Sequence, residues 1–168
     1  MQKTLLRYTL AGILFTWITG TLFHFVYEWS GHNFFVGLFA PVNESIWEHM
    51  KLIFFPMLFY FFWENKRLGQ SFPSLSCNNI MAILAGTFLI PILFYTYSGI
   101  LGTNYPILDI STFYISVVVA FILRFRLTVK NMSFRFCPLL AAVTFLLLLC
   151  FWIFTVYPPD LGIFISPV

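Results

Sequence analysis

Residues 41–63 of the chain read PVNESIWEHMKLIFFPMLFYFFW, and this stretch decides both the fold class and where a function is sought. Its second half is an apolar run rich in phenylalanine. Its first half gathers two Glu, a His and a Lys, in a protein of which only 9% of residues are charged. Ionisable groups at the edge of hydrocarbon cost free energy, so we expect this group to face protein or a wet cavity and to have a role.

The composition of the whole chain indicates a membrane protein. Of 168 residues, 60% are hydrophobic, whereas a soluble domain carries about a quarter charged residues. Nine Lys and Arg and six Asp and Glu are too few to cover a surface in water. The sequence therefore predicts an all-α, polytopic membrane helix bundle that forms a single domain over residues 1–168. We interpret the net charge of +3 as a topology signal, so no nucleic-acid partner is predicted.

Five stretches have the length of a transmembrane helix, which takes about 20 apolar residues. They cover approximately residues 10–29, 44–63, 77–101, 107–123 and 137–157. Eight of the nine basic residues lie before the first span, between the second and third, or between the fourth and fifth. Cytoplasmic loops are enriched in Lys and Arg, so this alternation predicts a cytoplasmic N-terminus and an external C-terminus.

The segments at the predicted outer face are too apolar to extend into water. Residues 30–43, SGHNFFVGLFAPVN, are predicted to form a re-entrant or interfacial turn. The tail after Pro158 and Pro159 is predicted to fold back over the same face. The three cysteines, Cys77, Cys137 and Cys150, form no CxxC pair, so no disulfide is expected.

The charged stretch is predicted to open the second helix. Asn43 has the properties of an N-cap, and Glu44 in the first turn would complement the helix dipole. At about 100° per residue, Glu44, Glu48 and Lys51 share one narrow face, while His49 points to a different neighbour. We expect Lys51 to pair with Glu48 or with Glu44.

The first span supplies partners for this face. His24 and Glu28 are four residues apart at its outer end and are expected to interact. Because the first two spans are antiparallel, His24 should lie level with Glu48 and His49. The sequence thus predicts an outer pocket with additional contributions from Asp109 on the fourth span and, if the turn folds inward, from His32.

Imidazoles and carboxylates together are typical ligands of zinc and related divalent metals. The predicted metal ligands are His24, Glu28 and Glu48, with His49 as an alternative to Glu48. Glu48, His49 and Lys51 are the candidate catalytic residues, and Asn43, Glu44 and Asp109 are candidates for substrate binding. A metal-bound water would be the nucleophile, with a spare Glu as general base. Without a metal, a Glu–His pair would move protons and Lys51 would bind a phosphate or carboxylate.

Three functions remain open from the sequence. The first is a metal-dependent hydrolase or transferase that acts on a lipid-like or small amphipathic substrate. The second is a small transporter or an accessory subunit that binds a partner within the bilayer. The third is a structural bundle, in which the ionisable groups form closed ion pairs. An open polar pocket would distinguish the first from the third.

The motifs HFVYEWSG (24–31) and PVNESIWEHMKLIFFP (41–56), with YPP (157–159) before an apolar tail, resemble a family of small multi-span bacterial membrane proteins without an assigned function. The resemblance covers most of the chain, and NESxWEHxK is its most distinctive part. It implies a multi-pass protein of the bacterial cytoplasmic membrane. No activity follows from it.

Overall fold

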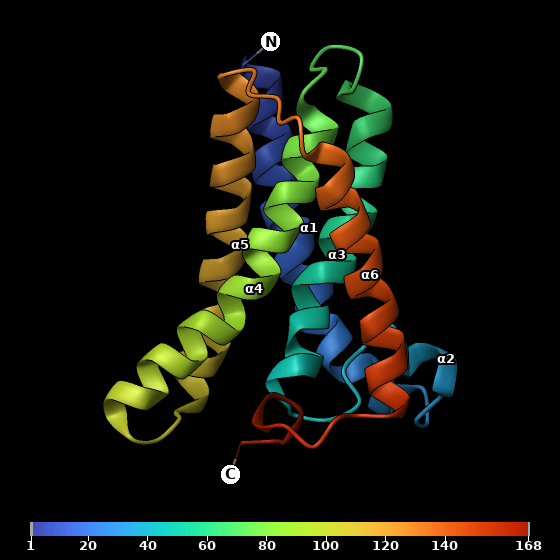
Figure 1. Cartoon of the computed structure of the whole chain (residues 1–168), viewed down its shortest axis with the longest axis vertical. Helices are drawn as coiled ribbons and strands as arrows, with labels where there is room; N and C mark the ends of the chain where they lie inside the picture. Colours follow the sequence, from blue (N-terminus) through green and yellow to red (C-terminus); the bar gives the residue numbers. More distant parts are fainter. Residues whose placement is uncertain (1, 168) are drawn as a thin grey trace.

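The structure, a computed structural model, describes residues 2–167, and its regular elements in that range are all helical (Figure 1). Four long helices are apolar enough to cross a membrane: α1 (Gln2–Trp29), α4 (Leu75–Leu101), α5 (Pro106–Val129) and α6 (Cys137–Val156). The remaining elements are α2 (Phe34–Gly37), α3 (Ile46–Leu68) and the short 3₁₀ helix η1 (Gly162–Phe164). This architecture agrees with the predicted helical membrane bundle. That α3 is a fifth span, and that the N-terminus lies on the cytoplasmic side, are still predictions.

The central helix of the bundle is α3. It packs against α1, α4 and α6, and α5 completes a four-helix group by contacting both α1 and α4. Most of α3 is buried, including the charged side chains of Glu48, Lys51 and Glu64. α3 is not among the four helices that are apolar enough to cross a membrane, and the neighbouring helices shield its charged side chains.

Close packing of α1 depends on small residues. Its buried face consists of Leu5, Thr9, Gly12, Thr16 and Gly20. A Cβ on Gly12 would lie 2.3 Å from the Phe121 ring, and one on Gly20 would lie 2.5 Å from the Phe113 ring. Small residues at such spacing let membrane helices approach closely. The α1–α5 contact is therefore fixed by aromatic rings of α5 that fill the two glycine positions.

Two prolines interrupt the helices near their middle. Pro56 in α3 and Pro91 in α4 have no N–H, so each leaves the carbonyl four residues earlier without its helical donor. Beyond Pro91, α4 leads away from the bundle axis together with the start of α5 (Figure 1). We call residues 92–111 the arm. Within it, Asp109 accepts hydrogen bonds from the Tyr97 hydroxyl and from Asn104 Nδ2, the latter at 3.2 Å.

The link between α1 and α3 contains the short helix α2. α1 ends in a turn in which His32 N donates to the Tyr27 carbonyl at 3.1 Å, with Gly31 and His32 both at positive φ. Asn33 then caps α2, which leaves the rings of Phe34 and Phe35 exposed. An exposed apolar turn at the end of the bundle is compatible with the predicted interfacial turn, whose depth in a bilayer stays a prediction.

The C-terminal tail folds back beneath the bundle (Figure 1). After Pro158 and Pro159, η1 packs on the first turn of α3, with the Phe164 ring centroid 5.0 Å from that of Trp47. This is the fold-back that the two prolines predicted.

The expectation that the chain has no disulfide was wrong. Cys77 and Cys137 form a disulfide between the starts of α4 and α6, with their Cα atoms 5.6 Å apart. The two residues are 60 positions apart in the sequence, so only the packing of α6 against α4 brings them together. Cys150 is free.

Candidate metal site

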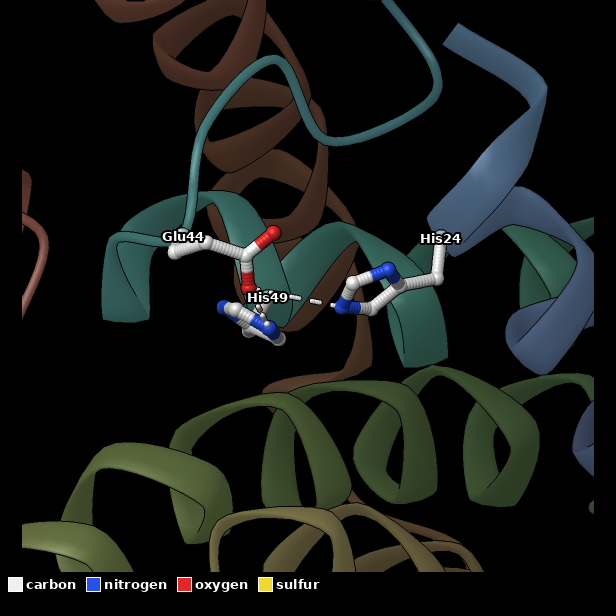
Figure 2. A group of neighbouring side chains, drawn as sticks. All are labelled: His24, Glu44 and His49. Atoms are coloured by element: carbon white, nitrogen blue, oxygen red, sulfur yellow. Dashed lines mark ion pairs between the residues drawn. The ribbon is translucent and has the colours of Figure 1, made fainter. Parts of the chain in front are cut away.

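Three side chains from separate segments meet at the end of the bundle that holds α2 and η1 (Figure 2). Glu44 Oε2 lies 3.4 Å from His24 Nε2 and 3.4 Å from His49 Nε2. One ligand atom from each residue falls within 4.8 Å of the others. We call His24, Glu44 and His49 the metal cluster.

Each member of the metal cluster is held by a different element. His24 projects from the last part of α1, and His49 from the first turn of α3. Glu44 lies in the turn before α3, where Asn43 Oδ1 accepts a hydrogen bond from Ser45 N at 2.9 Å. Ser45 is the N-cap of α3, and its hydroxyl accepts from Glu48 N at 3.4 Å.

This start of α3 corrects the predicted one. Asn43 was expected to be the N-cap, but the helix begins at Ile46 because Asn43 bonds within its own turn. Glu44 consequently lies outside the helix and does not share a face with Glu48 and Lys51. It turns instead toward the two histidines.

The ring of His49 is oriented by a backbone contact. Its Nδ1 lies 2.9 Å from the Ser45 carbonyl oxygen, which has no proton to donate, so Nδ1 carries the hydrogen. In the neutral ring the lone pair is then on Nε2, which faces Glu44 and His24. In metal sites, a hydrogen bond from the ring nitrogen that does not bind the metal fixes the tautomer of the histidine in the same way.

The environment keeps Glu44 ionised. The pKa of the Glu44 carboxyl is lowered, chiefly by its hydrogen bond with His49, and the nearby His24 acts in the same direction. Partial burial opposes the shift. Glu44 has a side-chain exposure of 65%, compared with 33% for His24 and 26% for His49, so the metal cluster is open on one side.

The geometry of the cluster fits a small divalent metal. Zinc–nitrogen and zinc–oxygen bonds of about 2.0–2.2 Å place neighbouring ligand atoms of a tetrahedron about 3.3–3.5 Å apart. The two nitrogen–oxygen separations of 3.4 Å, which are also those of His–Glu ion pairs, are close to this edge, and the three ligand atoms all lie within 4.8 Å of one another. Three protein ligands leave the fourth position to water or a substrate, as in catalytic zinc sites.

Glu48 and Lys51, predicted as catalytic residues, lie in a closed ion pair beside this site. Lys51 Nζ is 2.7 Å from Glu48 Oε2 and also donates to the Gly37 carbonyl at 2.9 Å and to Thr155 Oγ1 at 2.5 Å. Glu48 Oε2 accepts from Val42 N at 3.0 Å. Both charges are buried, with every proton of the ammonium group used. Of the two predicted partners of Lys51, Glu48 is the one that pairs with it, and the pair links α3 to the α2 turn and to α6.

The other predicted site residues are not brought into the cluster. The expected His24–Glu28 pair does not form: Glu28 lies 3.8 Å from His32, at the exposed end of α1. His24 reaches across to Glu44 because the turn before α3 passes next to it (Figure 2). Asp109 lies on the arm, bonded to Tyr97 and Asn104.

A second buried ion pair was missed by the sequence analysis. Arg124 Nη2 lies 2.5 Å from Glu64 Oε1, and both side chains are fully buried. Arg124 also donates to Thr9 Oγ1 at 3.1 Å, and Asn79 Nδ2 donates to Glu64 Oε2 at 3.3 Å. Arg124 had been counted among the basic loop residues because the apolar run seemed to stop at residue 123. The helical continuation FILRFRLTV was the signal that α5 extends to Val129.

Comparison with protein families identifies the chain's relatives. A model of the family of unknown function DUF6512 matches residues 1–168. The chain belongs to this family. The match is consistent with the resemblance to an uncharacterised family. That NESxWEHxK is the motif of this family, and that its members are bacterial, are still predictions. No curated protein and no solved structure matched this DUF6512 chain.

Proposed function

We propose that this DUF6512 protein is a multi-pass protein of the cytoplasmic membrane that binds one divalent metal, preferably zinc, at the metal cluster. In the proposed topology all five long helices cross the membrane, and the cluster lies at the external interface. The bound metal would activate a water for hydrolysis, or for group transfer, on a lipid-like or small amphipathic substrate. The proposed ligands are His24, Glu44 and His49, which replaces the earlier set of His24, Glu28 and Glu48.

The convergence of two imidazoles and one carboxylate at tetrahedral spacing supports this proposal most directly. His24 comes from α1, whereas Glu44 and His49 lie five residues apart at the start of α3, so helical periodicity does not explain why His24 meets the other two. The tautomer of His49 is set for ligation by the Ser45 carbonyl. The exposure of Glu44 leaves a route for water and substrate.

An amphipathic substrate suits the surroundings of the cluster. The arm leaves apolar side chains exposed, including Ile100, Tyr105 and Ile107. Such a surface can accommodate an acyl chain while the polar end of the same molecule reaches the metal. Glu44 would bind the metal, and Asp109, at the base of the arm, remains a candidate for contacting the polar end of the substrate.

Zinc titration of purified protein tests the metal site. Protein stripped with EDTA should bind one zinc per chain in calorimetry, with a raised unfolding temperature. The His24→Ala and His49→Ala variants should each lose this binding because only two ligands remain. His32→Ala is the matched control, since His32 lies at the same end but pairs with Glu28 outside the cluster. Equal zinc binding by wild type and by His24→Ala would refute the site.

Lipid turnover tests the chemistry separately. Fluorescent phospholipid and acyl-ester substrates in mixed micelles should be cleaved by the zinc-loaded protein and not after chelation, and His49→Ala should be inactive. Binding without turnover of these substrates would instead favour an accessory or structural role. The closed Lys51–Glu48 and Arg124–Glu64 pairs are the observation that supports this second possibility.

A further inference from the structure

The second half of α3 leaves one stripe of its surface uncovered. Phe59, Phe62, Trp63, Lys66 and Arg67 have the i, i+3, i+4, i+7, i+8 spacing that places residues on one face of a helix. The three aromatic side chains are 48%, 64% and 46% exposed, and both cations are exposed as well. We call these five residues the α3 stripe. It consists of an aromatic part along the helix and a cationic part at the end of the helix.

The cations of the α3 stripe are held against its aromatic rings. Lys66 Nζ lies 4.2 Å from the centroid of the Phe62 ring, and Arg67 Cζ lies 6.0 Å from that of Trp63. Both contacts are within the range of cation–π attraction. Trp63 is in turn stacked on Tyr8 of α1, with ring centroids 5.5 Å apart. The two positive charges are therefore held next to exposed apolar surface, and neither forms an ion pair within residues 2–167.

The surroundings of these cations are positive. Arg7 is exposed on α1 and lies one residue from Tyr8, so it is level with the last turns of α3. The acidic residue in this part of the described chain, Glu64, is buried and paired with Arg124. The other acidic residues lie at the opposite end of the bundle, on the arm or in the tail: Glu28, Glu44, Glu48, Asp109 and Asp160. The cationic part of the stripe therefore favours a negatively charged ligand.

The aromatic part of the α3 stripe leads into an apolar groove. Phe59 lines this groove together with Phe23 and Val26 of α1 and with Phe35 and Phe39 of the link that contains α2. The groove has a volume of about 370 Å³, and its lining side chains are all apolar. A surface of this kind, continuous with exposed phenylalanine and tryptophan rings, favours a hydrocarbon chain over a polar ligand.

The length of the α3 stripe fits one leaflet of a bilayer. Lys66 follows Phe59 by seven residues, which corresponds to about 10 Å along the helix. The hydrocarbon of one leaflet is about 15 Å deep, half of the core of a bilayer. An acyl chain that starts beside Lys66 therefore passes the aromatic rings and reaches the apolar groove at Phe59 before it ends.

We propose that the α3 stripe and the apolar groove bind one anionic phospholipid from the leaflet at the basic end of the bundle. Its phosphate contacts Lys66 and Arg67, and one acyl chain lies over the aromatic rings and enters the groove past Phe59. Basic side chains at the end of a membrane helix attract anionic headgroups. A zwitterionic lipid binds less well, because its ammonium group is repelled by the cations and finds no exposed carboxylate among the described residues of this end.

This inference is independent of metal binding and of the orientation in the membrane. The α3 stripe shares no residue with the metal cluster, which lies at the other end of α3. The lipid is drawn from whichever leaflet the basic end contacts. A failed zinc titration therefore leaves the lipid site untouched, and the experiments below contain EDTA so that no metal bridges phosphate to protein.

Native mass spectrometry of the full chain in detergent tests the proposal. The protein is titrated with phosphatidylglycerol or with phosphatidylcholine that has the same acyl chains. Phosphatidylglycerol should occupy one tight site per chain, with an affinity more than about tenfold above that of phosphatidylcholine. Lys66→Gln/Arg67→Gln should weaken the tight site by about thirtyfold, or about fivefold for each cation near the headgroup. Both side chains are exposed, so the variant keeps the packing of the bundle.

Arg126→Gln/Lys130→Gln is the matched control. It also removes two exposed cations, but from the end of α5, outside the α3 stripe. This variant should keep the tight site. Equal weakening by the two double variants would show that the lipid responds only to the total charge and would overturn the site. Equal affinities of the wild type for the two lipids would overturn it as well.

Brominated lipids test where the acyl chain lies. Bromine on the chain quenches tryptophan fluorescence at short range, and the contribution of Trp63 is the difference between the wild type and Trp63→Phe, which keeps an aromatic ring. In phosphatidylcholine vesicles, a small fraction of brominated phosphatidylglycerol should quench this contribution more than the same fraction of brominated phosphatidylcholine. Equal quenching by the two lipids overturns the proposal, because it shows that no anionic lipid is enriched at the α3 stripe.

Discussion

Glu44 and Glu48 are four residues apart, yet their environments give them different roles. Glu48 is buried and neutralised by Lys51, whereas Glu44 is largely exposed and lies between two imidazoles. The difference arises from the helix start at Ile46, which leaves Glu44 in the preceding turn. A shift of the helix start by two residues would pull Glu44 away from the histidines.

The pH dependence of zinc binding follows from the ligand types. The pKa of Glu44 is lowered, so its carboxylate stays ionised below the usual carboxyl range and does not limit binding on the acid side. Protons compete for the imidazoles instead, because each histidine must lose its proton to bind the metal. Zinc affinity should therefore fall steeply between pH 7.5 and 5.5, by more than about tenfold, because two imidazoles must lose protons.

Zinc calorimetry at the two pH values measures this change. Glu44→Gln should weaken zinc binding at both values while keeping the same steep fall, since the two histidines remain. An affinity that is constant from pH 7.5 to 5.5 would show that imidazoles are not the ligands.

At the scale of the elements, the α1–α3 contact depends on a proline and a glycine on facing helices. Pro56 leaves the Leu52 carbonyl without its helical donor. That oxygen lies against Gly20 of α1, at 2.6 Å from where a Cβ would be. Glycine is required at this position because the neighbouring atom belongs to the backbone and cannot rotate away.

Gly20→Ala should therefore destabilise the protein by about 1–3 kcal/mol, the usual cost of overpacking. Gly99→Ala is the control, because a Cβ there meets no atom within 4 Å and α4 is helical at that position. It should be neutral or stabilise by up to about 1 kcal/mol through helix propensity. Thermal unfolding in detergent compares the two. Equal unfolding temperatures for both variants would contradict the close contact.

At the scale of the whole molecule, a buried ion pair and its polar neighbours join four helices at the end opposite the metal cluster. Thr9 of α1, Glu64 of α3, Asn79 of α4 and Arg124 of α5 meet in one hydrogen-bonded network. Glu64 and Arg124 are both removed from solvent. Removing either side chain would therefore leave the other as a buried charge without a partner.

Arg124→Met alone should destabilise the bundle by about 3–5 kcal/mol, because Glu64 is left uncompensated. The double variant Glu64→Leu/Arg124→Met should be more stable than the single one, since apolar groups replace both charges. Chemical unfolding in detergent measures the difference. A double variant that loses the sum of the two single effects would show that the two side chains act independently, which would contradict the ion pair.

The sequence predicts contacts between residues that are close along the chain better than contacts between distant residues. The helical membrane class, the approximate positions of the long helices and the Lys51–Glu48 pair follow from local composition and spacing. The His24–Glu44 pair could not be foreseen, because it joins α1 to the turn before α3. The Glu28–His32 pair has the same four-residue spacing as the expected His24–Glu28 pair, so spacing alone did not decide between them. The burial of Arg124 was missed because a charge at the end of an apolar run resembles a loop residue.

The sequence by itself determined that this chain is apolar enough for a membrane and that its ionisable groups gather near the start of α3. Those properties depend on residue type and on neighbours a few positions away. Tertiary structure alone decided which distant groups meet: Glu44 with His24, Arg124 with Glu64, and Cys77 with Cys137. Each of these contacts joins different elements, and the packing of helices against α3 and α4, rather than spacing along the chain, sets their distances.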